Sequence, residues 1–419
     1  MLSWLSPDGK LILLTTTLRS FAVGFVSVLL GLYLAETGFD AGKVGALLAA
    51  VLAGNTLATT VASLFADSFG RRKSFIALSC LTIVGGILFP LTDSFILLMV
   101  IGAFAGFGLG GKDRAAQSAL EQPVLSQAAP AASRTSLFAY YNMIGGLAAG
   151  VGALFSSFPV VLDKAFGIEI IDTFKAMFFV YAGVGIAVTL IYTRLSSAVE
   201  ASPTDKPVRG ITWPRQSKAI VFKLSALGGM DSFGGGFMLQ TFLAYWFTVR
   251  FDLPLESLAG VFFAANLLSS FSSILAVHIA RRIGLINTMV FTHIPANLLV
   301  LGVAFSPFAW LAIVFLLLRE CFSQMDVPTR QSYTMAVVPP EERTAAAGMT
   351  TLGRQGGQMI APYIAGQLVV SSFLSAPLVI GSTIKVAYDL LVYAQFRNIK
   401  PPEEVERPTE AKASENPSS

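Results

Sequence analysis

The sequence predicts an all-α membrane protein with twelve transmembrane helices, arranged as two pseudo-symmetric six-helix bundles. Three observations lead to this prediction: an apolar composition, regularly spaced apolar stretches, and a repeat of the first half of the chain in the second. Of the 419 residues, 54% are hydrophobic and 13% are charged, whereas soluble domains carry about 25% charged residues. The composition excludes the ordinary soluble classes of protein.

The apolar stretches are long enough to cross a bilayer, because about 20 apolar residues span roughly 30 Å of hydrocarbon. The first stretch is too long for the core of a signal peptide, so we expect it to remain as a helix of the mature protein. The expected helix centres, in chain order, are Val26, Ala53, Val84, Ala103, Gly150, Gly183, Gly236, Asn266, Asn297, Phe315, Met359 and Val386.

An internal repeat aligns the first half of the sequence with the second half. Arg19-Ser20-Phe21 returns as Asp231-Ser232-Phe233, so the repeating unit is about 200 residues long. Two copies of one apolar half are typical of secondary transporters, which hold their solute between the halves. A segment rich in Ser, Pro and charge separates the copies, and the end of the chain is polar. We expect an N-terminal bundle over 1–194, a linker over 195–217, a C-terminal bundle over 218–398 and a disordered tail over 399–419.

The distribution of Lys and Arg predicts the orientation. Most of the 29 basic residues fall on one side of the predicted helices if both termini and the linker are cytoplasmic, as the positive-inside rule requires. We therefore expect a multi-pass protein of the plasma (inner) membrane with both termini in the cytoplasm. The net charge of +4 is interpreted as anchoring to membrane lipid and not as a nucleic-acid surface.

A sequence signature lies between the second and third predicted helices. Residues 63–73 read SLFADSFGRRK, in which Gly70 allows a tight reversal and Arg71 and Arg72 stay at the headgroups. With Asp67, this loop resembles the signature of the major facilitator superfamily, although the customary leading glycine is a serine here. The resemblance covers nearly the whole chain and implies alternating access, in which two bundles rock about a central cavity.

The resemblance implies a secondary active transporter of a small organic solute, which we expect to be a proton-coupled exporter acting as a monomer. Two motifs of proton-driven drug exporters are absent, since helix four has no mid-helix Arg and helix five has no Pro between Tyr140 and Phe158. Uptake or exchange of an organic anion recognised by Arg19 and Arg354 is the alternative transporter, and a transport-inactive receptor or scaffold is the alternative of another class. We expect no enzyme activity, cofactor or metal: the only histidines are His278 and His293, without a nucleophile motif or metal-ligand spacing.

Charged residues inside the apolar stretches are candidate functional residues, because a charge at mid-bilayer needs a partner or a wet cavity. The repeat places Arg19 and Asp231 at equivalent points on the first helix of each bundle. The hypothesis is that they face each other across the cavity, with Asp231 as the protonatable coupling residue. A static bridge that fixes the closed state is the competing interpretation.

The remaining intramembrane charges lie on the last three predicted helices. Lys385 and Asp389 are four residues apart and are expected to pair on one helix face. Arg354 either pairs with Glu320, which leaves Arg319 unmatched, or faces the cavity. The polar candidates for contact with the solute are Tyr141, Asn142 and Gln240.

Similar polar motifs stand at the inner ends of helices four and ten. Each combines Asp, Arg, Gln and Ser and is followed by another Arg, which predicts symmetric gates that lock by charge pairing. A ring of solvated residues at the headgroups is the alternative. The gating candidates, besides the signature loop, are Asp113, Arg114, Arg134, Asp326, Arg330 and Arg343.

Overall fold

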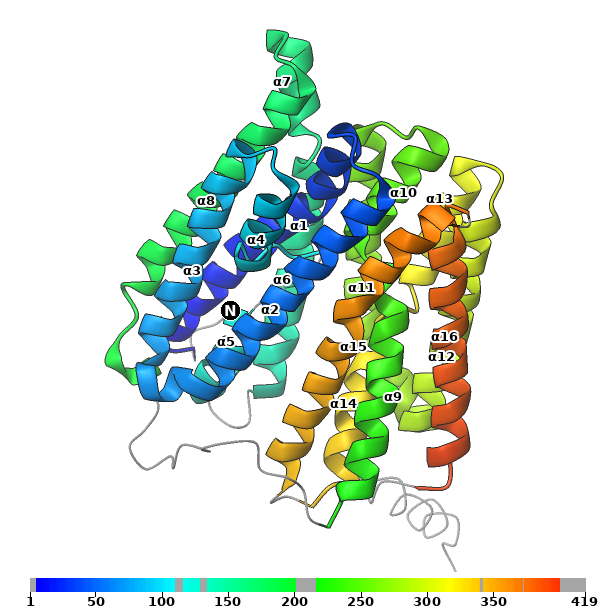
Figure 1. Cartoon of the computed structure of the whole chain (residues 1–419). Coiled ribbons are helices and arrows are strands. Elements are labelled where there is room, and N and C mark those ends of the chain that lie inside the picture. The colour runs from blue at the N-terminus through cyan, green and yellow to red at the C-terminus, as the bar shows by residue number, and fades with distance from the viewer. Residues whose placement is uncertain are drawn as a thin grey trace, which may run out of the picture.

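The computed structural model contains α-helices and short 3-10 helices, and no strand occurs within the residues that it describes, namely 5–109, 116–128, 134–200, 216–339, 342–371 and 373–399 (Figure 1). The helices of the first half are α1 (Pro7–Glu36), α2 (Ala41–Phe69), α3 (Arg71–Leu88), α4 (Phe95–Phe104), α5 (Ala116–Gln127), α6 (Arg134–Phe155), α7 (Phe158–Phe166) and α8 (Ile170–Tyr192). Those of the second half are α9 (Lys218–Gly236), α10 (Gln240–Phe251), α11 (Leu255–Ile283), α12 (Leu285–Phe305), α13 (Ala309–Glu320), α14 (Asp326–Ala336), α15 (Arg343–Ser371) and α16 (Ala376–Phe396).

These helices form two bundles, and each predicted helix centre falls within a helix of the structure. Eight helical spans within the described ranges are long and apolar enough to cross a membrane. Three crossings are made of two shorter helices each: α4 with α5 along α2, α9 with α10, and α13 with α14 along α11 and α12. The fold class is confirmed. The expected tail and most of the expected linker lie outside the described residues.

The interruptions have local causes in the sequence. Gly234, Gly235 and Gly236 end α9, and glycine is a poor helix former because its backbone is so free. The chain restarts at Gln240 as α10. The backbone N–H of Thr241, in the first turn of α10, donates to the carbonyl of Leu109 in the other bundle. An orphan donor of the new helix is thus satisfied across the bundle interface.

The two bundles lie close together at the end that carries α7 and farther apart at the end where α8 stops and α9 begins (Figure 1). We call these the α7 end and the linker end. Cross-bundle contacts at the α7 end include the ion pair between Lys164 and Glu256 and the packing of α2 against α15 and of α1 against α10. The structure is therefore closed at the α7 end.

The closest approach between α2 and α15 depends on two glycines. A Cβ atom at Gly45 would lie 2.3 Å from the carbonyl oxygen of Pro362, and one at Gly366 would lie 2.3 Å from that of Ala41. Real Cβ atoms do not make contacts this short, and helix–helix contacts in membranes use small residues for this reason. The closed α7 end requires both positions to stay without a side chain.

Replacing Gly366 by Leu is expected to separate α2 from α15 and to shift the protein toward states that are open at the α7 end. Spin labels on the exposed positions Lys43 and Ser371 would report a longer distance between the helices by double electron–electron resonance. Gly183→Leu is the control, because a Cβ atom at Gly183 meets nothing within 4 Å. An unchanged distance distribution in Gly366→Leu would contradict this interpretation of the interface.

Candidate functional site

A polar cavity of about 90 Å³ lies where two of the interrupted crossings approach each other. Its walls come from the break between α9 and α10, from α11, and from the break between α13 and α14. Interrupted helices with cavities at their breaks form the solute and ion sites of many transporters. The polar residues that line the cavity are Gln240, Asn266, Ser269, Glu320 and Gln324.

Hydrogen bonds orient the side chains of this cavity. Nε2 of Gln240 donates to Oγ of Ser27, on α1 of the other bundle, at 2.9 Å. Oε1 of Gln240 accepts from Nδ2 of Asn266 at 3.3 Å. Glu320 is bound by Arg319 and accepts from Oγ of Ser323 at 2.6 Å. The cavity therefore offers oriented amides and one charge-balanced carboxylate, and it touches both bundles through Gln240.

Asp231, buried in α9, is surrounded by basic side chains from three other helices. Lys385 on α16 donates to its Oδ1, and Nη1 of Arg354 on α15 donates to its Oδ2 at 3.1 Å. Nη1 of Arg330 on α14 lies 3.5 Å from the same oxygen. A buried carboxylate remains charged only where such partners offset its desolvation. We define the Asp231 cluster as Asp231, His293, Asp326, Arg330, Arg354, Lys385 and Asp389.

Two more carboxylates balance this cluster. Asp326 accepts from Nη1 of Arg330, one helical turn further along α14. Oδ1 of Asp389 lies 2.8 Å from Nδ1 of His293, and its Oδ2 accepts from Nδ2 of Asn297 at 3.3 Å. Three carboxylates thus face three cations, so the cluster is neutral when His293 is neutral. Balance of this kind is what permits so many ionisable groups inside a membrane protein.

The first bundle contains a simpler cluster around Glu121 on α5, which we call the Glu121 cluster. Nη2 of Arg19 on α1 lies 3.1 Å from Oε2 of Glu121. The same carboxylate accepts from Oγ1 of Thr16 at 3.1 Å, from the hydroxyl of Tyr141 on α6 at 2.9 Å, and from that of Tyr192 on α8 at 3.2 Å. One buried pair with satisfied oxygens therefore joins four helices of this bundle.

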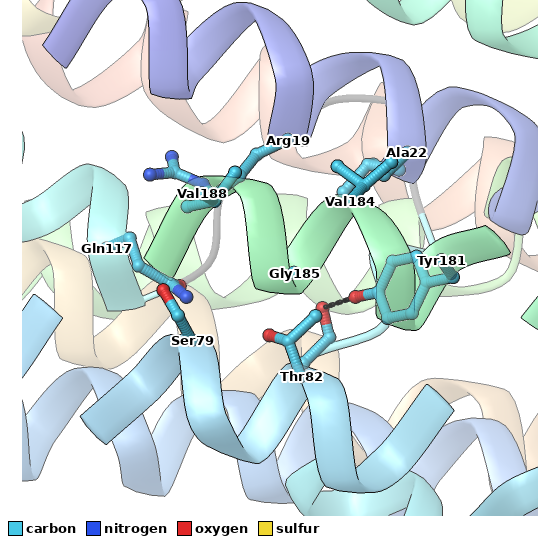
Figure 2. A pocket seen from close by; sticks show the side chains of 11 residues that line it. Arg19, Ala22, Ser79, Thr82, Gln117, Tyr181, Val184, Gly185 and Val188 are labelled. Atoms are coloured by element: carbon cyan, nitrogen blue, oxygen red, sulfur yellow. Dashed lines mark hydrogen bonds between the residues drawn. The ribbon is translucent and has the colours of Figure 1, made fainter. Parts of the chain in front are cut away.

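A small cavity adjoins Arg19 in the first bundle (Figure 2). Its volume is about 20 Å³, which is enough for one water molecule. Arg19, Gln117 and Ser79 surround it together with Tyr181, whose hydroxyl donates to the carbonyl of Gly106 at 3.0 Å (Figure 2).

The structure does not bring Arg19 and Asp231 together, so the expected pairing across the cavity is wrong for this conformation. Each is instead paired within its own bundle, Arg19 with Glu121 and Asp231 with Lys385 and Arg354. The physical reason is that a buried charge requires a partner at hydrogen-bond distance, and each bundle supplies one. The equivalent positions on the first helix of each bundle thus carry opposite charges, Arg19 and Asp231, and each charge belongs to a separate cluster.

Two other expected pairings are also wrong. Lys385 and Asp389 are four residues apart, yet Lys385 contacts Asp231 while Asp389 contacts His293. Arg354 pairs with Asp231, and Glu320 pairs with its neighbour Arg319. Neighbouring helices offer buried partners that spacing along one helix does not reveal.

The remaining candidates are distributed as follows. Gln240 lines the cavity, Tyr141 belongs to the Glu121 cluster, and Asn142 is exposed. Asp326 and Arg330, expected at a gate, belong to the Asp231 cluster, in which Asp326 is buried and the side chain of Arg330 is 14% exposed. The residues that lie outside the described part of the chain are Asp113 and Arg114, and the same holds for the side chains of Asp67, Arg134 and Arg343.

The signature loop is held by a residue that the sequence did not single out. Gly70 has φ of 103° and joins α2 to α3. The carboxylate of Glu200, directly after the 3-10 helix Ser197–Val199 that follows α8, accepts from the backbone N–H groups of Arg71 at 2.7 Å and of Arg72 at 3.3 Å. The start of the linker is therefore fixed to the loop between α2 and α3.

Sequence reasoning also missed Glu121 and the role of His293. Glu121 lies among polar residues, in Gln117-Ser118-Ala119-Leu120-Glu121-Gln122, which resembles the end of a helix more than its buried interior. A signal existed in the i, i+4 spacing of Gln117 and Glu121, both of which are buried. His293 had no acidic residue near it in the sequence that could have revealed its partners.

Comparison with known proteins agrees with the fold. The chain is similar to the uncharacterized membrane protein YJR124C of Saccharomyces cerevisiae, with 23% identity over 425 residues that cover 94% of this chain and 95% of the relative. The xylose transporter XylE of E. coli, in an inward-open conformation, superposes with a TM-score of 0.72 at 14% identity and covers 94% of this chain and 98% of its own. The nucleoside transporter NupG does so with a TM-score of 0.69 at 15% identity, covering 94% of this chain and 100% of its own. At these identities the structural likeness is one of fold.

The family is shown by the sequence itself. The family model of the Major Facilitator Superfamily matches residues 12–362, which is most of the chain. The described part of the chain also has the multi-pass helical architecture of that family. The chain therefore belongs to the Major Facilitator Superfamily and is an integral membrane protein of the transport kind.

Proposed function

We propose that this protein is a proton-coupled secondary transporter that moves a small polar organic solute by alternating access of its two bundles. The observation that carries the proposal is the polar cavity at the helix breaks. It is bounded by α10, which packs against α1, and by α11, which packs against α6. Rocking of one bundle against the other would therefore change the walls of this cavity.

The lining of the cavity favours a neutral or cationic solute that makes several hydrogen bonds. Gln240, Asn266 and Gln324 offer amide donors and acceptors, and Glu320 adds a carboxylate. The organic-anion alternative has less support, since both arginines assigned to anion recognition, Arg19 and Arg354, bind carboxylates of the protein. Nucleosides and the pentose xylose, after which the transporters NupG and XylE are named, have suitable chemistry and are sensible first probes.

Proton coupling is proposed to reside in the Asp231 cluster. Asp231 keeps the coupling role expected from the sequence, but its partners are Lys385 and Arg354 in place of Arg19. A carboxylate that exchanges partners between conformations changes the proton affinity of the ionisable groups around it as well as its own. Such a group can link the direction of a proton gradient to the rocking of the bundles.

The distribution of basic residues supports a proposed orientation and direction of transport. The linker end carries the basic signature loop and is assigned to the cytoplasm by the positive-inside rule, which makes the present structure inward-open. Export across the plasma membrane by a monomer is the expected direction. Protons moving opposite to the solute would support it.

The test is transport by purified protein in liposomes, with and without a pH gradient, of a pentose, a nucleoside, a primary amine and a dicarboxylate. We expect gradient-dependent accumulation of a neutral or amine probe and none of the dicarboxylate. Gln240→Leu and Asn266→Leu should each weaken the apparent affinity for that probe about tenfold, because each leaves hydrogen-bonding groups unsatisfied.

Asn287→Leu is the matched control, because Asn287 on α12 donates to the carbonyl of Ile283 at the end of α11 and does not line the cavity. Transport of the dicarboxylate alone would contradict the proposal. Cavity variants that behave like Asn287→Leu would refute the assignment of the cavity.

A further inference from the structure

His293 on α12 lies between two carboxylates. Its Nδ1 is 2.8 Å from Oδ1 of Asp389 on α16, and its Nε2 is 3.9 Å from Oδ1 of Asp231 on α9. The imidazole side chain is 5% exposed. Among the described ion pairs Asp389 contacts no other basic side chain, so His293 joins this acid to the rest of the Asp231 cluster.

The protonation state of the ring decides how many of these contacts it satisfies. A neutral imidazole has one N–H donor and one lone pair, whereas an imidazolium has two donors. Because an ionised carboxylate only accepts, the short contact places the hydrogen of the neutral ring on Nδ1, toward Asp389. The lone pair of Nε2 then points toward Asp231, an acceptor facing an acceptor. A proton added at Nε2 converts this contact into an attraction.

The surroundings of His293 contain both signs of charge. Asp231 comes from α9, and Asn297, one turn further along α12, has its Nδ2 3.3 Å from Nδ1 of His293. The groups from the other packed helices are Asp326 and Arg330 on α14, Arg354 on α15, and Lys385, Tyr388 and Asp389 on α16. With three carboxylates and three permanent cations, a proton on His293 gives the cluster a surplus of one positive charge.

The surplus of positive charge is relieved most easily if Arg354 leaves the cluster. Its side chain is 24% exposed, compared with 14% for Arg330 and 8% for Lys385. Lys385 is also held by the backbone carbonyl of Asp231 at 3.3 Å, and Arg330 is held by Asp326. Arg354 is therefore the most exposed of the three cations and has the fewest contacts that hold it in the cluster.

We propose that His293 takes up the coupled proton and that its protonation releases Arg354 from Asp231. The inference rests on the proposed proton coupling and names the group that performs it. The proton comes from water, forms an N–H bond with the lone pair of Nε2, and leaves by the reverse step. No carboxylate changes its charge, and no bond between heavy atoms forms or breaks.

Release of Arg354 would be transmitted to the bundle interface. Arg354 lies on α15, which packs against α9 in its own bundle and against α2 in the other. Its stem contacts Gly228 on α9, where an added Cβ atom would meet Cγ of Arg354 at 3.2 Å. Loss of the ion pair to Asp231 therefore weakens the hold of α9 on the helix that contacts the other bundle.

The test uses the proton as the probe and needs no knowledge of the solute. His293 and His278 are the two histidines of the chain, so in a His278→Gln background the ring nitrogens of ¹⁵N-labelled His293 are seen alone by NMR in nanodiscs. Spin labels at the exposed linker-end positions Ser68 and Arg282, in a protein with both cysteines replaced, report the distance between bundles. We expect the distance to change with pH at the same midpoint as the His293 signals.

Substitutions then separate coupling from folding. His293→Gln should abolish the pH response of the distance and reduce gradient-driven transport to the level seen without a gradient, while solute exchange at equal pH continues. His278→Gln should leave both unchanged. Asp389→Asn should weaken the pH response of the distance, because the imidazolium loses the carboxylate oxygen that lies 2.8 Å from its Nδ1.

Three results would overturn the inference. If a proton gradient drives transport equally in the wild type and in His293→Gln, the inference fails and the proposed coupling stands. If a gradient drives transport in neither, both fail. The NMR titration keeps His293 in place, so its result does not depend on whether His293→Gln folds. Ring signals of His293 that stay constant across the pH range of transport would refute the proposal.

Discussion

Replacing Asp231 by Asn is expected to abolish gradient-driven accumulation and to lower the free energy of unfolding by about 3–5 kcal/mol. The substitution leaves Lys385, Arg354 and Arg330 facing one another without the carboxylate that they share, and removing one partner of a buried ion pair costs this much. Accumulation in proteoliposomes with a pH gradient and unfolding of the purified protein are the two measurements.

A double variant separates coupling from stability. Asp231→Asn combined with Lys385→Met removes one charge of each sign, so the cluster is balanced again. We expect the double variant to be more stable than Asp231→Asn and to exchange solute at equal pH, yet to remain unable to use the gradient. Gradient-driven accumulation that survives in a stable double variant would contradict the coupling role of Asp231.

Glu121→Gln is expected to have a comparable effect on the stability of the first bundle, again about 3–5 kcal/mol. Arg19 would keep its buried charge but lose its carboxylate, and the hydroxyls of Thr16, Tyr141 and Tyr192 would lose a charged acceptor. Bonds to a charged group are about twice as strong as neutral ones. The measurement is thermal unfolding in detergent, compared with the wild type.

The matched variant replaces both partners by apolar residues. Arg19→Met with Glu121→Leu leaves no buried charge, and such replacements of whole ion pairs are often neutral or stabilising. We expect the double variant to unfold near the wild-type temperature and well above Glu121→Gln. If both variants were equally unstable, the pair would not be the reason for the loss, and packing of the long Arg19 side chain would explain it instead.

The sequence was sufficient for the architecture because that depends on patterns along the chain. Three local or periodic features predicted the fold: apolar stretches of sufficient length, the repeat that relates Arg19 to Asp231, and the loop at Gly70. The fold expected from them is confirmed. The breaks that divide three crossings were not expected, although Gly234-Gly235-Gly236 marks one of them.

The partners of the buried charges could not be predicted in the same way. Spacing on one helix favoured Lys385 with Asp389, but the contacts are made between helices, Lys385 with Asp231 and Asp389 with His293. Which faces meet depends on the rotation and tilt of whole helices, and these follow from packing that a single sequence does not display. The cavity at Gln240 and Asn266 depends on the same packing.

The most direct test of the central claim is to record proton flux and solute flux together in proteoliposomes of the wild-type protein. A pH-sensitive dye inside the vesicles follows the protons, and a radiolabelled probe from the panel follows the solute. Proton-coupled alternating access predicts that a solute gradient alone drives protons across the membrane in a fixed ratio to the solute, in the opposite direction if the protein exports. Solute flux without proton movement, unchanged when the proton gradient is collapsed, would contradict the account.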